Sequence, residues 1–168
     1  MHKYKFLILI FIMLLSFNNF AFAESVALDK SGDTELQNLI KETVPKFTQL
    51  VYSENGIEMP CNMFLPDNYP GNKKYPLVVF IADGSTVGKE TDAPLKQGLG
   101  GIIWASKTEQ AKRECIVIVP QYPKRIVDDK TGTTAAEYIL LTENLIRAVI
   151  DGLQVDSKKI YVTGQSMG

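Results

Sequence analysis

The sequence predicts an α/β fold with a doubly wound, mostly parallel sheet that is preceded by an antiparallel hairpin. Three observations lead to this prediction. Short apolar runs without polar alternation recur from the middle of the chain onward, which is typical of strands covered on both faces. Stretches with helical spacing of apolar residues separate these runs. An Asn55-Gly56 pair joins two earlier extended runs, and this pair favours a tight hairpin turn.

The composition is that of a globular domain or of part of one. The 168 residues are 45% hydrophobic and carry 18 Lys and Arg against 19 Asp and Glu. This balance leaves no basic stripe for a phosphate backbone, so we expect no nucleic acid partner. The one histidine is His2. If a leader that contains it is removed, a histidine-based zinc site and a Ser-His-Asp triad within the chain are both excluded, and we expect no metal or other cofactor.

The first 23 residues are typical of a secretory signal peptide. Lys3 and Lys5 precede an apolar run from Phe6 to Leu15, and Ala21-Phe22-Ala23 offers small residues for cleavage. An uncleaved membrane anchor is the alternative, but the run is about half of the roughly 20 residues that a bilayer span needs. We therefore predict a secreted or periplasmic protein that is cleaved near Ala23 and has no stable membrane anchor.

A helix and a hairpin are expected to open the mature chain. Apolar residues at helical spacing predict a helix over Thr34 to Val44, which Pro45 ends. Extended runs over Phe47 to Tyr52 and Met59 to Leu65 flank the Asn-Gly pair and predict two antiparallel strands. The predicted divisions are a signal peptide over 1–23, a helical segment over 24–46 and the α/β domain over 47–168.

Three strands are expected to form the parallel part of the sheet, namely Leu77 to Ala82, Ile116 to Val119 and Ile160 to Thr163. A helix-prone stretch from Trp104 to Glu114 separates the first two. The alternation of strand and helix predicts right-handed crossovers and helices on both faces of the sheet.

A longer helix is expected between the second and third of these strands. Thr134 with Glu137 three residues later has the pattern of a capping box at its start. The apolar residues then recur at intervals of three and four, as on one face of an amphipathic helix. They are Tyr138, Leu141, Leu145, Val149 and Leu153.

Cys61 and Cys115 are the two cysteines. Export to an oxidising compartment would permit a disulfide between them. Their apolar surroundings favour the alternative, two buried thiols on strands of the sheet.

Two short segments give weaker indications of function. Gly98-Leu99-Gly100-Gly101 follows no strand and lacks a P-loop lysine, so we interpret it as a flexible stretch of loop on the substrate side. Tyr122 and Pro123 come just after a strand, at the edge where open α/β sheets bind ligands, so substrate contact is one interpretation of them.

The motif with the clearest chemical meaning is Gly164-Gln165-Ser166-Met167-Gly168, directly after the strand that ends at Thr163. A strand that breaks into a tight turn places the serine hydroxyl outward, and flanking glycines remove Cβ atoms that would clash. The turn also aims the backbone N–H of Met167 at the position of a tetrahedral oxyanion. We predict Ser166 as a nucleophile and Met167 as an oxyanion donor; the alternative is a glycine-rich turn with an ordinary serine.

Further segments belong to the same pattern: Phe64-Leu65-Pro66, Tyr75 to Phe80, Trp104-Ala105-Ser106, Val119-Pro120-Gln121 and Asp156 to Thr163. With the serine motif, they resemble the α/β-hydrolase family, in particular the exported esterase branch related to prolyl oligopeptidase catalytic domains and dienelactone hydrolases. The resemblance runs from about Met59 to Gly168. It implies a serine hydrolase without a cofactor that acts on a small-molecule or polymer ester.

The resemblance implies a second oxyanion donor in the turn after the strand Leu77 to Ala82. Where that family has a His-Gly turn, this sequence reads Asp83-Gly84-Ser85. The backbone N–H of Gly84 or Ser85 can still serve, because that donor does not depend on the side chain. Asp83 would oppose a developing negative charge if it faced the site. We favour its other interpretation, a turn former ahead of Gly84.

In that family the acid and the histidine follow the serine along the chain. The sequence ends two residues after Ser166, so we expect an incomplete α/β-hydrolase fold, the N-terminal part of a longer serine esterase. A non-catalytic or vestigial binding module of the same fold is the alternative. The oligomeric state is not predicted. Four earlier acidic residues are interpreted as solvated charges, namely Asp92, Asp128, Asp129 and Asp151.

Overall fold

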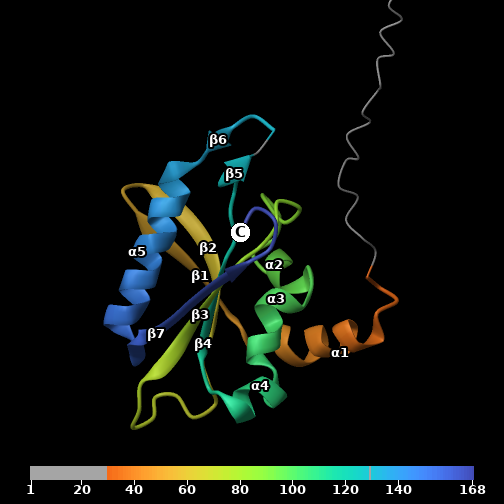
Figure 1. Ribbon diagram of the computed structural model, residues 1–168, viewed down its shortest axis with the longest axis vertical. Coiled ribbons are helices and arrows are strands. Elements are labelled where there is room, and N and C mark those ends of the chain that lie inside the picture. The colour runs from red at the N-terminus through yellow and green to blue at the C-terminus, as the bar shows by residue number, and fades with distance from the viewer. Residues whose placement is uncertain (1–29, 129) are drawn as a thin grey trace, which may run out of the picture.

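The computed structural model describes residues 30–128 and 130–168 (Figure 1). The predicted signal peptide lies outside the described residues, as does Asp129. In the two described ranges, no helix is both long and apolar enough to span a membrane. The elements, in order, are α1 (Thr34–Thr43), η1 (Val44–Lys46), β1 (Thr48–Glu54), β2 (Ile57–Phe64), β3 (Tyr75–Ile81), α2 (Ala93–Lys96), α3 (Leu99–Ile102), η2 (Ile103–Ala105), α4 (Lys107–Lys112), β4 (Ile116–Pro120), β5 (Val127–Asp128), β6 (Thr133–Thr134), α5 (Ala136–Gly152) and β7 (Val155–Gly164).

Five strands form the main sheet in the order β1-β2-β4-β3-β7. The pairs β1·β2 and β2·β4 are antiparallel, whereas β3·β4 and β3·β7 are parallel. The three strands that the sequence predicts as parallel, β3, β4 and β7, do pair in parallel, but the described sheet as a whole is mixed and not mostly parallel. The reason is that the hairpin does not stand apart: β2 pairs directly with β4 and continues the sheet.

The hairpin turn has the geometry that the Asn-Gly pair predicts. Asn55 has a φ of 52° and Gly56 a φ of 76°. A two-residue turn with positive φ at both positions matches the right-handed twist of the flanking strands. β1 and β2 consequently pair in register from Thr48↔Met63 to Glu54↔Ile57.

Both faces of the sheet are covered at β3 and β4, which accounts for the continuous apolar runs in these two strands. Figure 1 shows α5 on one side of the sheet and α1 to α4 on the other. Successive residues of β3 alternate between the two sides, because side chains in a strand point to opposite faces. Leu77 and Val79 belong to the core under α5, while Val78 and Phe80 belong to the core under the shorter helices. The expectation of helices on both faces is confirmed.

The start of α5 differs from the predicted capping box. Thr134 lies in β6, where it pairs with Val127, and Ala135 is the N-cap without a side-chain cap. Glu137 instead forms an ion pair with Lys124. The capping prediction is wrong because the residue meant to cap is held in a two-stranded ribbon. The predicted apolar face is correct, since Leu141, Leu145 and Val149 are buried; Tyr138 and Leu153 pack at its margin.

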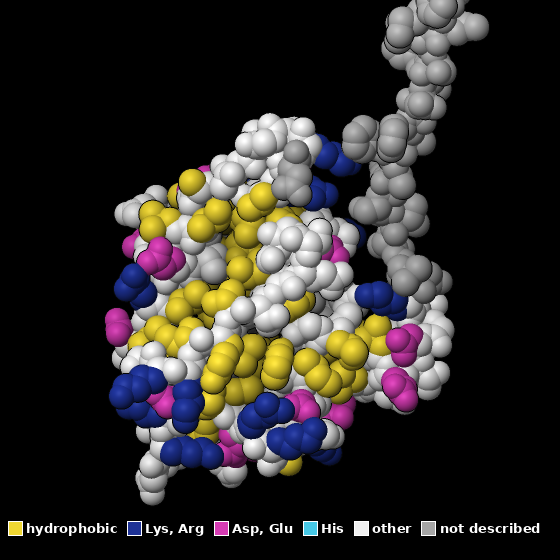
Figure 2. Space-filling model, viewed as in Figure 1, with side chains coloured by type: hydrophobic (Ala, Val, Ile, Leu, Met, Phe, Trp, Pro, Cys, Tyr) yellow, Lys and Arg dark blue, Asp and Glu magenta, His cyan; other side chains and the backbone are white. Residues whose placement is uncertain are grey.

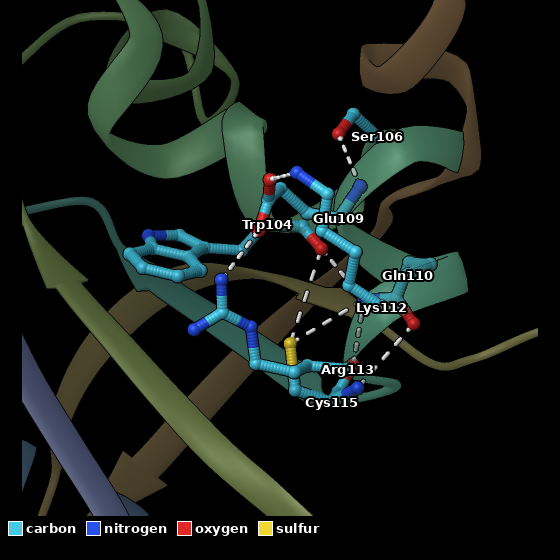
Figure 3. Close-up of polar contacts among 7 residues, drawn as sticks. All are labelled: Trp104, Ser106, Glu109, Gln110, Lys112, Arg113 and Cys115. Carbon is cyan, nitrogen blue, oxygen red and sulfur yellow. Dashed lines mark hydrogen bonds and ion pairs between the residues drawn. The ribbon is translucent and has the colours of Figure 1, made fainter.

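Both cysteines are buried free thiols, so the disulfide alternative is excluded in this structure. Cys61 lies in the core under α5, and Cys115 lies in the core on the opposite side of the sheet. A network around Cys115 fixes α4 against the start of β4 (Figure 3). Gln110 donates from Nε2 to the carbonyl oxygens of Trp104 at 2.6 Å and of Cys115 at 3.2 Å, and its Oε1 accepts the Cys115 N–H at 3.3 Å.

The glycine-rich stretch at Gly98 is not a flexible loop, because it forms most of α3. A Cβ on Gly100 would overlap the ring of Phe80, and one on Gly101 would lie 3.2 Å from the same ring. These glycines let α3 approach β3 closely, so their role is packing.

Candidate functional site

The serine motif forms a tight turn at the carboxyl end of β7. Gly164 pairs with Ile81, the last residue of β3. The N–H of Gln165 donates to the carbonyl oxygen of Ile81 at 3.1 Å, and the N–H of Gly168 donates to that of Gln165 at 3.0 Å. In the middle of the turn, Ser166 is exposed and has a φ of 54°, a conformation that few non-glycine residues adopt. Backbone strain of this kind is typical of residues held in place for function.

The two motif glycines are required by backbone contacts. A Cβ on Gly164 would lie 2.7 Å from the carbonyl oxygen of Gly168. A Cβ on Gly168 would overlap the carbonyl oxygen of Ile81 and lie 2.7 Å from its carbonyl carbon. Contacts this short with rigid backbone have no room for a side chain. The spacing of the motif therefore follows from how the turn packs on the end of β3.

The turn after β3 is held by Asp83. Its Oδ1 accepts the Ser85 N–H at 2.6 Å, and its carbonyl oxygen accepts the Thr86 hydroxyl at 3.0 Å. Its Oδ2 accepts a hydrogen bond from Nε2 of Gln165 at 3.4 Å. Asp83 is thus a turn former, the interpretation that the sequence favoured. Both carboxylate oxygens have donors, and one of these donors belongs to the serine turn.

Backbone donors from both turns lie at the same end of the sheet. Within the described ranges, the N–H groups of Gly84 and Met167 have no hydrogen-bond acceptor. The N–H of Ser85 already donates to Asp83. Of the two candidate oxyanion donors in the turn after β3, Gly84 is therefore the one whose backbone N–H is available. Because Ile81 pairs with Gly164, the segments that carry Gly84 and Met167 begin side by side.

Two buried amide side chains, which the sequence analysis did not single out, hold the long loop that follows this turn. Gln121 donates from Nε2 to the carbonyl oxygens of Thr86 at 2.6 Å and Lys89 at 3.0 Å. Asn62 donates from Nδ2 to the carbonyl oxygen of Thr91 at 2.6 Å. The available signal was a polar amide within or directly after an otherwise apolar strand, since such a group must find partners when it is buried.

Tyr122 belongs to the core and not to a ligand site. Its side chain is buried, and its hydroxyl shares a hydrogen bond with the Thr142 hydroxyl at 2.9 Å. Burial raises the pKa of Tyr122 to about 12. Pro123 is exposed and lines an open groove of about 610 Å³ with the β1–β2 hairpin and the start of α5. Ser166 does not line that groove.

Two of the acidic residues that precede the serine have local partners. Asp92 forms an ion pair with Lys96 at 2.6 Å, and Asp128 accepts the Lys130 N–H at 3.0 Å. Asp151 is exposed near the end of α5. Across residues 30–128 and 130–168, no three His, Cys, Asp or Glu side chains are grouped so that they could hold a metal ion.

The outer part of β7 is uncovered. Tyr161 is 56% exposed and Val162 59% exposed, although they are neighbours that point to opposite faces. Figure 2 shows apolar side chains across the middle of the face over which β7 runs in Figure 1. In the described part of the sheet, β7 is an edge strand that has β3 as its neighbour.

Neither a protein-family model nor a curated protein matches the sequence. Solved structures of esterases do match the fold. A thermostable esterase is 27% identical with a TM-score of 0.69, over 76% of this chain and 36% of that chain. A thermophilic esterase from the Planctomycetes species Thermogutta terrifontis is 17% identical with a TM-score of 0.51, over 74% of this chain and 41% of that chain.

A hyperthermophilic esterase from the archaeon Pyrobaculum calidifontis is 16% identical with a TM-score of 0.50, over 81% of this chain and 44% of that chain. The described chain therefore has an α/β fold of the kind found in esterases of the α/β-hydrolase type. It spans less than half the length of each of these three proteins.

Proposed function

We propose that the complete gene product is an exported serine hydrolase that cleaves carboxylic esters, with Ser166 as its nucleophile. The observation that carries this proposal is the conformation of Ser166, an exposed serine with a φ of 54° in a glycine-bounded turn on the end of β3. The esterase neighbours of the fold support the reaction class. We propose further that the protein belongs to the esterase branch related to prolyl oligopeptidase catalytic domains and dienelactone hydrolases. The 168 residues are then the N-terminal part of a longer α/β-hydrolase domain.

In the proposed reaction, Oγ of Ser166 attacks the ester carbonyl carbon while the hydroxyl proton passes to a general base. The carbonyl oxygen becomes an oxyanion, which the N–H groups of Met167 and Gly84 stabilise. Collapse of this intermediate expels the alcohol, which takes the proton from the base, and water then hydrolyses the acyl-enzyme. The base is not an imidazole of the described residues, because the 168 residues contain one histidine, His2.

The substrate is proposed to be a small-molecule or polymer ester. The proposal includes no cofactor and no nucleic acid. A fluorophosphonate probe tests the nucleophile directly, since it phosphonylates an activated serine. In the complete protein, the probe should label Ser166, and Ser166→Ala should abolish both labelling and the hydrolysis of a 4-nitrophenyl ester. Ser85→Ala is the matched control, because its backbone donor is retained while a nearby hydroxyl is removed.

Retention of full activity by Ser166→Ala would place the nucleophile elsewhere. If the complete protein neither reacts with the probe nor hydrolyses esters, it is a non-catalytic module of this fold.

Export is the second part of the proposal. We propose that the signal peptide over 1–23 is removed and that the protein is secreted or periplasmic, without a stable membrane anchor. N-terminal sequencing of the exported protein should give Glu24 as the first residue. Met1 at the N-terminus of the exported protein would contradict the proposed removal of the signal peptide.

A further inference from the structure

Arg125 lies against the turn that carries the proposed oxyanion donor. It comes from the segment between β4 and β5, far from Gly84 in the sequence. A Cβ built on Gly84 would overlap a guanidinium nitrogen of Arg125 and lie 2.6 Å from its Cζ. The guanidinium therefore occupies the space where a side chain at position 84 would point, in contact with the backbone of that turn.

Among the residues that the structure describes, no hydrogen bond or ion pair involves the Arg125 guanidinium. The Asp83 carboxylate is bound by Ser85 and Gln165. The pKa of Asp128 is lowered chiefly by the hydrogen bond from the Lys130 N–H, and the charge of Arg125 is the smallest of the causes.

The neighbouring cation behaves differently. Lys124 forms an ion pair with Glu137, and its ammonium lies 5.6 Å from the centroid of the Tyr138 ring. Lys124 is thus committed to the start of α5, whereas Arg125 is directed to the turn of Gly84. The side chain at position 125 places an exposed guanidinium beside the site, with its N–H groups available to a ligand.

We propose that Arg125 is a specificity-determining residue that binds a carboxylate on the substrate, so that the preferred esters carry a negative charge on their acyl or alcohol part. This inference rests on the proposed function. A guanidinium presents a planar pair of N–H groups that matches a carboxylate, which makes it a selective partner for this group. The oxyanion itself already has two backbone donors, and Arg125 flanks that position on the Cα side of Gly84.

Two matched substrate pairs test the inference on the complete protein. The alcohol part is tested with 4-acetoxybenzoate against 4-acetoxybenzamide, and the acyl part with mono-4-nitrophenyl adipate against 4-nitrophenyl hexanoate. We expect the ratio of kcat/KM for the anionic over the neutral ester to fall by about 5-fold or more in Arg125→Gln in one of the two pairs, as for loss of a charged hydrogen-bonding partner. Arg125→Lys should retain part of the ratio, and high salt should reduce it in the wild type.

Lys124→Gln is the matched control, because it removes the adjacent cation and should leave the ratio unchanged. An unchanged ratio in Arg125→Gln for both pairs would overturn the inference. If kcat/KM falls equally for the charged and the neutral ester, the ratio is also unchanged, and such a fall would indicate a structural role or a role in oxyanion binding.

A binding measurement separates this inference from the proposed function. Calorimetric titration of the Ser166→Ala protein with 4-acetoxybenzoate and mono-4-nitrophenyl adipate, each against its neutral partner, needs no hydrolysis. Tighter binding of an anionic ester that Arg125→Gln abolishes would support the anion site even if the wild type hydrolyses nothing. Hydrolysis without any preference that depends on Arg125 would instead support the proposed function and overturn the anion site.

Discussion

Gly168 and Ile81 contact each other backbone to backbone, because a Cβ on Gly168 would lie 2.7 Å from the carbonyl carbon of Ile81. The same Ile81 carbonyl oxygen accepts the Gln165 N–H at 3.1 Å. The end of β3 thus serves as the surface on which the serine turn is built, and the conformation of Ser166 depends on it.

Gly168→Ala should therefore separate the serine turn from β3. We expect the free energy of unfolding of the complete protein to fall by about 1 to 3 kcal/mol, as for overpacking against rigid backbone, together with a loss of fluorophosphonate labelling. Urea titration and the labelling rate measure the two effects. Gly152→Ala is the control, because the added Cβ would have no atom within 4 Å other than those of its chain neighbours and of the adjacent backbone of α5, and it should not lower stability. Equal stability of the two variants would contradict this account.

The chain of 168 residues should not hydrolyse esters by itself. A serine hydroxyl needs a positioned base, whose assistance typically contributes about 10² to 10⁴-fold, and the one histidine is His2. Purified chain incubated with a 4-nitrophenyl ester should give the same rate as its Ser166→Ala variant. A clear excess of the wild-type chain over that variant would show that another residue supplies the base.

Tyr122 should make stability fall at high pH. Burial raises the pKa of its hydroxyl from 10.0 to about 12. Below pH 10 the hydroxyl is protonated in the folded and in the unfolded chain. Between pH 10 and about pH 12 it ionises in the unfolded chain but not in the folded one, and this favours unfolding. The free energy of unfolding should therefore fall by about 2 to 3 kcal/mol as the pH rises toward 12. Urea titrations from pH 9 to 12 measure the loss, which should be smaller in Tyr122→Phe.

The phenylalanine variant keeps the Thr142 hydroxyl bonded to the Tyr138 carbonyl oxygen at 2.8 Å, so it should cost about 1 kcal/mol at neutral pH. An identical alkaline loss in Tyr122→Phe would assign the effect to other groups.

The expressed chain of 168 residues should self-associate through β7. Tyr161 and Val162 expose apolar surface on both faces of a strand that is an edge in the described sheet, and such edges pair readily with other chains. Val162→Lys should shift the chain toward monomer in analytical ultracentrifugation, because a charge on an edge strand opposes pairing. The same substitution at the exposed Leu140 of α5 should have less effect. A monomeric wild-type chain would refute this prediction.

Local signals in the sequence predicted most of the fold. Asn55-Gly56 predicted the hairpin because asparagine and glycine adopt the positive φ that a two-residue turn requires. The apolar runs predicted β3 and β4 because a strand that is buried on both faces has no position for a polar side chain. The mixed character of the sheet could not be predicted in this way, since the pairing of β2 with β4 depends on contacts between distant segments.

The candidate site was predicted less completely. The glycine spacing around Ser166 was sufficient for the turn, because its constraints are local. Other contacts could not be predicted from local sequence. The hydrogen bond from the Ser85 N–H to Asp83 depends on a side-chain rotamer. The hydrogen bonds that Gln121 and Asn62 donate to the loop, and the contact of Arg125 with Gly84, join segments that are far apart in the sequence. The prediction that Thr134 caps α5 was wrong for the same reason, because Thr134 pairs with Val127 in the β5–β6 ribbon instead.

The positions of the two thiols give the protein a pair of internal reporters. Cys61 lies beneath α5 and Cys115 beneath α4, so the sheet separates them, and burial raises the pKa of Cys61 to about 11. Neutral, enclosed thiols react slowly with alkylating agents until the layer above them opens. Mass spectrometry of alkylation in increasing urea would therefore record which of the two helical layers detaches from the sheet first, without any engineered probe.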